Sequence, residues 1–211
     1  GVGGRGRDWE VFSGVHPNPV EDDVRQGAAV FREQGCDAVV ALGGGSPLDV
    51  GKAVRLLAKR PDLDFGKFYS EPADWSGLAP FVAIPTTAGT GSEVGRSSVI
   101  TLKATGRKAV IFHPELLARL VILDPVLTVG LPPKLTAATG ADALTHCIES
   151  YTCPAFHPMC DGIALEGIRL IVEALPRACR DGGDLDARGR MLVAAAMGAV
   201  AFQKDLGAVH S

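Results

Sequence analysis

Residues 42–49 read Leu-Gly-Gly-Gly-Ser-Pro-Leu-Asp, and this stretch decides the fold. The apolar run of residues 37–42 that leads into it is typical of a buried strand. After it, apolar side chains recur at helical spacing over residues 50–57. We expect Ser46 to cap this helix, with Asp49 three residues later completing a capping pattern. A buried strand, a glycine turn and a helix in this order predict an α/β fold.

The glycines of the turn, Gly43, Gly44 and Gly45, favour a bound diphosphate. Without side chains they let a phosphate approach the backbone, and the N-terminus of the following helix offers oriented N–H donors. A tight strand-to-helix turn with no ligand is the alternative. The stretch is neither a P-loop, which needs Gly-Lys-Ser/Thr, nor Gly-x-Gly-x-x-Gly, because position 48 is Leu.

A second polar loop follows the next apolar run. Residues 81–84 predict a short strand, and residues 85–93 read Pro-Thr-Thr-Ala-Gly-Thr-Gly-Ser-Glu. Its hydroxyl groups and glycines suit hydrogen bonds to phosphate or ribose. Ligands of open α/β sheets bind at the carboxyl ends of the strands, so we expect both loops to meet at one site.

The pattern changes at Leu131-Pro132-Pro133. Before this point strands alternate with helices, and further apolar runs at 98–101, 109–112 and 120–123 complete a largely parallel sheet. After it, three helices are expected, at about 134–152, 158–173 and 185–204. We therefore predict an α/β domain over residues 1–133 and the start of an all-helical domain over residues 134–211.

Composition excludes several function classes. The chain has 211 residues, with 21 Lys and Arg against 24 Asp and Glu, a net charge of −3. This charge disfavours nucleic acid as a partner. The longest mainly apolar run, 191–202, is far short of the ~20 residues of a membrane span. No apolar signal segment is visible, and five cysteines without a Cys-x-x-Cys pair favour a reducing compartment, so we expect a cytoplasmic protein without a membrane partner.

A candidate half of a metal site lies in the first of the three helices. Asp142 and His146 are four residues apart and share one helix face. A carboxylate and an imidazole so placed suit Fe²⁺ or Zn²⁺. On spacing alone a hydrogen-bonded pair is favoured over a metal site. His157 and Asp161 repeat the spacing in reverse, and we interpret them as surface or capping residues.

Together these residues resemble the iron-containing (group III) alcohol dehydrogenase family. Six motifs carry the resemblance in order. They are Val15-His16-Pro17-Asn18-Pro19, Gly43-Gly44-Gly45-Ser46-Pro47-Leu48-Asp49, residues 84–94, Thr105-Gly106-Arg107-Lys108, Leu123-Asp124-Pro125 and Ala138-Thr139-Gly140-Ala141-Asp142-Ala143-Leu144-Thr145-His146.

The resemblance implies a dehydroquinate synthase-like fold, with an N-terminal dinucleotide domain, a C-terminal helical domain and an active site between them. It also implies NAD or NADP as cofactor and a homodimer. The implied cofactor-binding residues are Asn18, Gly43, Gly44, Gly45, Ser46, Asp49, Thr86, Thr87, Thr90, Ser92, Lys108 and Leu127, with Asn18 and Lys108 on the nicotinamide-ribose side.

For the metal, the resemblance makes Asp142 and His146 the first two ligands, against the expectation from spacing alone. His210, in Gly207-Ala208-Val209-His210, becomes the third, and these ligands act catalytically through the metal, expected to be Fe²⁺ with Zn²⁺ as the alternative. A fourth ligand is expected beyond Ser211. The first strand–helix–strand unit of the nucleotide domain is also missing, so the chain is expected to be an internal piece of a longer protein.

The implied activity is the NAD(P)-linked interconversion of alcohols and aldehydes or ketones. Within the superfamily, maleylacetate reductase and glycerol dehydrogenase are the alternatives. A non-catalytic NAD(P)-binding fragment is an alternative of another class, and it would bind cofactor without turnover.

Overall fold

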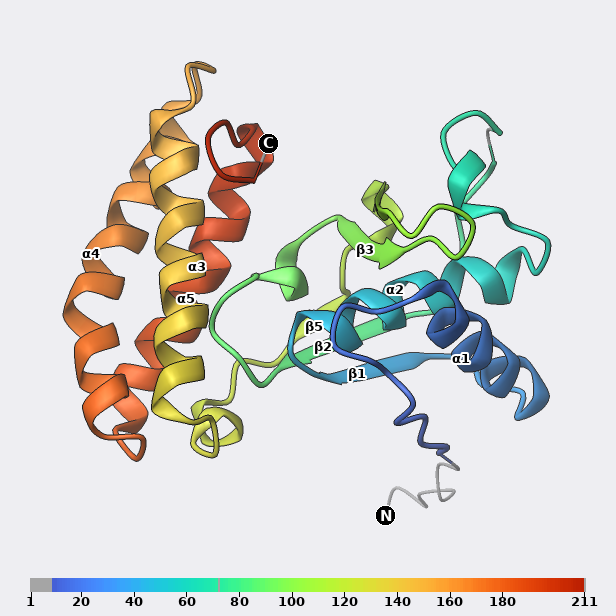
Figure 1. Cartoon of the computed structure of the whole chain (residues 1–211), viewed down its shortest axis with the longest axis horizontal. Coiled ribbons are helices and arrows are strands. Elements are labelled where there is room, and N and C mark those ends of the chain that lie inside the picture. The colour runs from blue at the N-terminus through green and yellow to red at the C-terminus, as the bar shows by residue number, and fades with distance from the viewer. Residues whose placement is uncertain (1–8, 72, 211) are drawn as a thin grey trace, which may run out of the picture.

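The computed structural model describes residues 9–71 and 73–210. Its α-helices are α1 (Glu21–Glu33), α2 (Gly45–Lys59), α3 (Pro133–Thr152), α4 (Pro158–Arg180) and α5 (Leu185–Ala201). Its strands are β1 (Val39–Gly43), β2 (Phe81–Pro85), β3 (Ser97–Thr101), β4 (Lys108–Phe112) and β5 (Leu120–Val121). Short 3-10 helices include η2 (Ser92–Val94), η4 (Pro125–Thr128) and η5 (Phe202–Lys204). The strands lie in an α/β part before α3, and α3, α4 and α5 form a helical part beside it (Figure 1).

The central sheet is parallel, as the sequence predicts. Its strand order is β1-β2-β5, with Val40 opposite Val82 and Val82 opposite Leu120. Ala41 and Phe81 are buried against Leu48 of α2, so α2 covers one face of this sheet. Side chains one residue along a strand point to the other face. There Val40 and Leu120 are 63% and 53% exposed, so none of the described elements covers this apolar face.

The runs at 98–101 and 109–112 do not join the parallel sheet. They form a separate antiparallel hairpin, β3-β4, with Val99 opposite Val110. The reason is the short connection between them, which allows a hairpin and is too short for a crossover helix. Gly106 lies in this connection with a φ of +65°.

The core of the α/β part lies between α1, α2 and the hairpin. Buried side chains of these elements, among them Val24, Leu56, Ile100 and Ile111, form one cluster. Each fully buried aliphatic side chain contributes about 1.5–3 kcal/mol to folding. This packing holds α2 between the parallel sheet and the hairpin, and so fixes the direction of its N-terminus.

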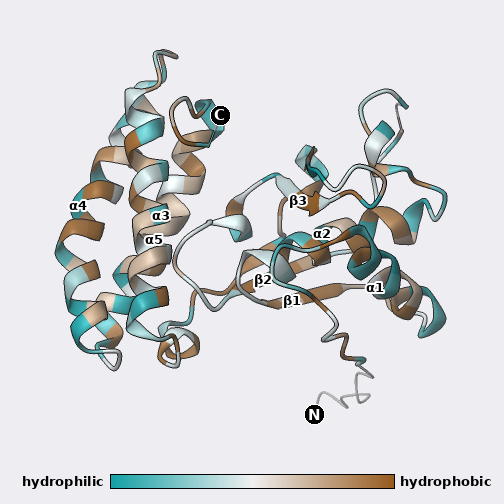
Figure 2. Ribbon diagram, viewed as in Figure 1, coloured by the Kyte–Doolittle hydropathy of each residue, from teal (hydrophilic) through white to brown (hydrophobic). Residues whose placement is uncertain are grey.

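The helical part has its own core, lined largely by small side chains. Ala143 and Cys147 of α3, Ala164 of α4 and Ala194 of α5 are buried where the three helices meet. Figure 2 shows pale to brown colour along much of these helices and hydrophilic residues near their ends. None of the helices among the described residues is long and apolar enough to cross a bilayer.

Two local predictions about helix ends are wrong. Ser46 does not cap α2: the N-cap is Gly44, Ser46 lies inside the helix, and Asp49 bonds to other partners. The helix begins two residues earlier than expected, after Gly44 in an extended conformation. The second helix of the helical part was expected to end at about residue 173, but α4 continues through Pro176 to Arg180. The only hydrogen bond that Pro176 removes is to the carbonyl of Val172, whose residue is 62% exposed and accessible to water.

Candidate metal and cofactor site

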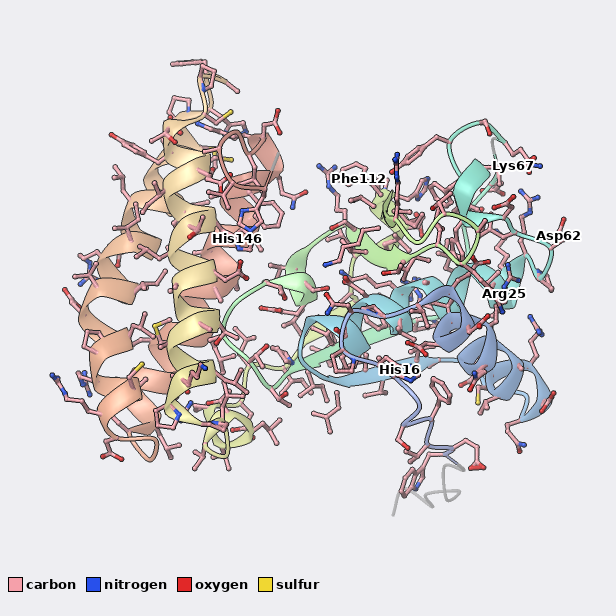
Figure 3. The ribbon with its side chains drawn as sticks, in the orientation of Figure 1. His16, Arg25, Asp62, Lys67, Phe112 and His146 are labelled. Atoms are coloured by element: carbon pink, nitrogen blue, oxygen red, sulfur yellow. The ribbon has the colours of Figure 1, made fainter. Side chains whose placement is uncertain are left out.

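A cleft of about 400 Å³ lies between the α/β part and the helical part. The α/β part lines it with the start of α2, the loop before β3 and the Asn18 segment, and the helical part lines it with α3 and the C-terminal segment. Figure 3 shows His146 projecting from α3 on the side that faces the α/β part. The cleft brings together most of the residues singled out in the sequence. These are Asn18, Gly45, Ser46, Asp49, Thr90, Ser92, Lys108, Asp142, His146 and His210.

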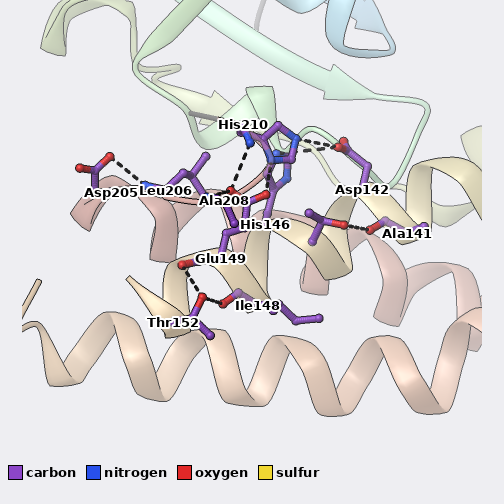
Figure 4. A network of polar contacts seen from close by, with 11 residues as sticks. Ala141, Asp142, His146, Ile148, Glu149, Thr152, Asp205, Leu206, Ala208 and His210 are labelled. Carbon is purple, nitrogen blue, oxygen red and sulfur yellow. Dashed lines mark hydrogen bonds and ion pairs between the residues drawn. The ribbon is translucent and has the colours of Figure 1, made fainter. Parts of the chain in front are cut away.

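Three of these residues converge on the helical side. Asp142 and His146 lie one turn apart on α3, with His146 Nε2 3.9 Å from Asp142 Oδ1. His210 comes from the segment after η5, and its Nε2 lies 3.3 Å from the same carboxylate oxygen. One ligand atom from each of the three residues lies within 4.8 Å of the others. Folding therefore joins a pair on one helix to a histidine more than 60 residues away (Figure 4).

This donor set fits a divalent transition metal. A carboxylate oxygen and two imidazole nitrogens are ligands that Fe²⁺ and Zn²⁺ share. His146 is 6% exposed, and burial lowers its pKa, although the negative charge of Asp142 opposes this. The neutral imidazole, which burial favours, is the form that binds metals. Among the described residues, no fourth His, Cys, Asp or Glu joins this group.

Glu149, which was not predicted from the sequence, lies beside this group and binds one of its members, His210. It lies three residues after His146 on α3, is 2% exposed, and accepts a hydrogen bond of 2.8 Å from His210 Nδ1. Burial raises its pKa, but hydrogen bonds from the backbone of residues 208–210 outweigh this and lower the pKa to about 2. Its spacing from His146 was the available signal, because residues three apart share a helix face.

On the opposite wall, the glycine turn places the N-terminus of α2 at the cleft. Gly45 is the first residue of the helix, and no side chain caps it among the described residues. A Cβ on Gly45 would lie 2.9 Å from the Thr90 side chain, and one on Gly44 would lie 3.4 Å from Thr87. The turn is therefore packed against the second polar loop, and the N–H groups at the start of α2 are of the kind that bind anions.

The second polar loop, which follows β2, is also hydrogen-bonded to the glycine turn. The Thr86 amide donates to the Gly43 carbonyl at 2.8 Å, which aligns the ends of β1 and β2. Gly43, Gly44, Thr86 and Thr87 lie in these turns but do not line the cleft itself. Leu127 lies on η4 and is 40% exposed, and it does not line the cleft either.

A buried lysine supports this wall. Lys52 of α2 is fully buried, and its Nζ donates to Ser92 O (2.6 Å), Ser92 Oγ (2.8 Å) and Ser97 O (2.7 Å). Ser92 Oγ in turn donates to Asp49 Oδ1 at 2.6 Å. Burial lowers the pKa of Lys52 to about 8 and raises that of Asp49. Lys52 was not predicted from the sequence, although a cation among the mainly apolar residues 48–57 was a visible sign.

At the edge of the cleft, Lys108 Nζ donates to Asn18 Oδ1 at 3.0 Å. Asn18 has a φ of +56°, a left-handed conformation that few residues other than glycine adopt. The loop around it is held by Asp23, a buried carboxylate on α1 that accepts bonds from the backbone of His16 and Val20. The two residues that the resemblance places together are thus in contact.

Comparison with known proteins covers nearly the whole chain. Residues 3–125 match the family model described as "Iron-containing alcohol dehydrogenase". Residues 136–211 match the model described as "Fe-containing alcohol dehydrogenase family, C-terminal".

Individual relatives agree with both models. The chain is 46% identical to 4-hydroxybutyrate dehydrogenase of Cupriavidus necator, over 98% of this chain and 55% of that protein. A crystal structure of 1,3-propanediol oxidoreductase superposes with a TM-score of 0.89 at 42% identity, over 94% of this chain and 52% of the other. Sulfoacetaldehyde reductase from Bifidobacterium kashiwanohense, solved in complex with NAD+, gives a TM-score of 0.89 at 36% identity, over 94% and 53%. The chain spans about half the length of the relatives it matches.

Proposed function

Because the chain belongs to the iron-containing alcohol dehydrogenase family, we propose that this protein interconverts alcohols and aldehydes or ketones with a nicotinamide cofactor. The observation that carries the proposal is the convergence of Asp142, His146 and His210 across the cleft from the glycine turn. A cofactor bound at the turn and a metal bound at the three side chains would face the same space.

We also propose a division of labour between the two parts. Residues 1–133 form the NAD(P)-binding domain, and residues 134–211 begin the metal-binding helical domain. One of the similar solved structures holds NAD+, and this supports NAD as the cofactor of the present protein. The same proposal includes NADP as the alternative cofactor, Zn²⁺ as the alternative to Fe²⁺, a homodimer and a cytoplasmic location. Five free cysteines support the cytoplasmic location.

When bound, a divalent metal ion supplies Lewis-acid polarisation of the substrate oxygen, and the nicotinamide supplies the hydride chemistry. The chain's own residues prepare the cleft for both. Asp142 contributes negative charge, while His146 and His210 contribute neutral nitrogen donors. Gly45 places the N-terminus of α2 at the cleft, where a diphosphate would bind. The ring of Phe202, 5.0 Å from that of His146, adds an apolar wall beside the metal ligands.

The test is substitution of Asp142 in the native-length protein. Asp142→Ala removes the only charged ligand of the group, so we expect bound metal and alcohol oxidation both to fall more than about 100-fold. Metal content and NAD(P)+ reduction measure the two effects. Asp62→Ala, at an exposed carboxylate far from the cleft (Figure 3), is the matched control and is expected to change neither. Full metal content and activity in Asp142→Ala would refute the proposal.

A further inference from the structure

Among the described residues, the polar contacts of the Glu149 side chain all run to the segment that carries His210. Its Oε2 accepts the backbone N–H groups of Ala208 at 3.1 Å and of His210 at 3.2 Å. Its Oε1 lies 2.8 Å from His210 Nδ1. Figure 4 shows these contacts converging on the carboxylate from the segment above α3. One buried side chain thus binds both the backbone and the imidazole of the same residue.

The His210 segment has little else to hold it. It follows η5, is outside any helix or strand, and contains the exposed residues Ala208 and Val209. Among the described residues, its polar contacts with the rest of the chain are those to Glu149 and to Asp142. Its position relative to α3 therefore depends on Glu149.

The same contact decides which nitrogen of His210 carries the proton. A carboxylate only accepts hydrogen bonds, so Nδ1 must donate. In the neutral imidazole the lone pair is then on Nε2, the nitrogen that lies 3.3 Å from Asp142 Oδ1. A nitrogen must offer a lone pair to bind a metal, so this tautomer is the one that makes His210 a ligand.

We infer that Glu149 is a positioning residue that anchors the His210 segment on α3 and selects the tautomer of His210 that can bind a divalent metal through Nε2. The inference rests on the proposed function and deepens it. Outer carboxylates of this kind typically change metal affinity by about 10–100-fold when replaced.

Glu149→Gln is the decisive variant, because it keeps the anchoring of the His210 segment but changes the selection of the His210 tautomer. The amide oxygen of Gln keeps an acceptor for the two backbone N–H groups, so the segment stays anchored. The amide nitrogen then faces His210 Nδ1 and donates to it, which leaves the proton on Nε2. We expect the metal-free variant to fold, to show the Nε2–H tautomer of His210, and to bind Zn²⁺ about 10–100-fold more weakly.

The experiment is nitrogen NMR of the histidine rings in the metal-free native-length protein, with Zn²⁺ affinity from calorimetry. Glu166→Gln, an exposed carboxylate on α4, is the control and is expected to change neither. An Nε2–H tautomer in the unmodified protein would overturn the inference, even if the variant failed to fold. An unchanged tautomer and Zn²⁺ affinity in Glu149→Gln would overturn it too. If the unmodified protein bound no Zn²⁺, the metal function would fail, while the tautomer measurement would still decide this inference.

Discussion

At the scale of single residues, buried carboxylates organise the loops that line the cleft. Asp23 is 1% exposed and accepts bonds from the backbone of His16 (3.2 Å) and Val20 (3.1 Å) and from the His16 ring (2.7 Å). These contacts lie on both sides of Asn18, whose left-handed backbone is costly without such support. Burial raises the pKa of Asp23, but the bonds from His16 and Val20 outweigh it and lower the pKa below 3.8.

The lowered pKa predicts how stability depends on pH. A carboxyl group with a depressed folded-state pKa stabilises the fold fully above pH 3.8, its unfolded value, and loses this contribution as the pH falls through the folded value. Asp23→Asn cannot accept all three bonds, so we expect it to lower the free energy of unfolding by about 1–3 kcal/mol at pH 7. The difference from the unmodified chain is expected to shrink below pH 3.8.

Urea unfolding at several pH values checks this prediction. Asp22→Asn is the matched control, because the carboxylate of Asp22 lies next to Asp23 in the chain but is partly exposed and pairs with Lys103. Such a surface pair contributes about 1 kcal/mol or less. Equal losses in the two variants, or a loss in Asp23→Asn that does not depend on pH, would contradict the role given to Asp23.

At the scale of elements, the loop between β2 and η2 is enclosed between α2 and the helical part. A Cβ on Gly89 would lie 3.0 Å from Thr139 of α3. One on Gly91 would lie 2.3 Å from the Cβ of Ala199 and 2.7 Å from the carbonyl of Ala195, both on α5. Glycine is needed at 91 for two reasons, the close approach of α5 and a φ of +62°. The loop is therefore shaped by the helices that also carry the metal ligands.

Gly91→Ala separates these two reasons when it is compared with Gly106→Ala. Gly106 has a φ of +65°, and a Cβ there would meet nothing within 4 Å. Both variants should lose roughly 1–2 kcal/mol of stability, because alanine disfavours the left-handed backbone. Gly91→Ala should lose a further ~1–3 kcal/mol from overpacking against α5. Urea unfolding measures the difference, and equal losses would show that α5 does not press on the loop in solution.

At the scale of the whole molecule, the cleft depends on how the two parts are joined. Arg96, just before β3, donates from Nε to Gln203 Oε1 of η5 at 2.8 Å. Its guanidinium also lies 4.5 Å from the ring centroid of Phe112 on β4. Gln203 follows Phe202 in η5, so the Arg96–Gln203 hydrogen bond joins the hairpin of the α/β part to the wall of the metal site. The packing of Gly91 on α5 is a further link between the parts.

A double-mutant cycle on Arg96→Ala and Gln203→Ala tests the first link. A partly buried hydrogen bond from a charged donor should give a coupling energy of about 1 kcal/mol in unfolding experiments. The comparison pair is Arg169 and Glu173, an exposed pair within α4 for which about 0.3–0.5 kcal/mol is expected. A coupling near zero between Arg96 and Gln203 would mean that the two parts do not meet there in solution.

The sequence by itself determined the fold class and the order of its elements. Periodicity is a local property, so the strand before Gly43 and the three helices after Pro133 follow from nearby residues. The family also follows from sequence, because its motifs are contiguous. Helix ends were less well predicted, since Gly44, not Ser46, caps α2, and the reason is a backbone conformation that composition does not reveal.

Only the tertiary structure decided which distant residues meet. Spacing alone favoured a simple Asp142–His146 pair, and it took the chain's return after α5 to bring His210 to the same carboxylate. Glu149 and Lys52 were not identified as site residues from the sequence for the same reason. Their roles consist of contacts with segments 40 or more residues away, and burial and hydrogen bonding over such distances are set by packing, not by local sequence.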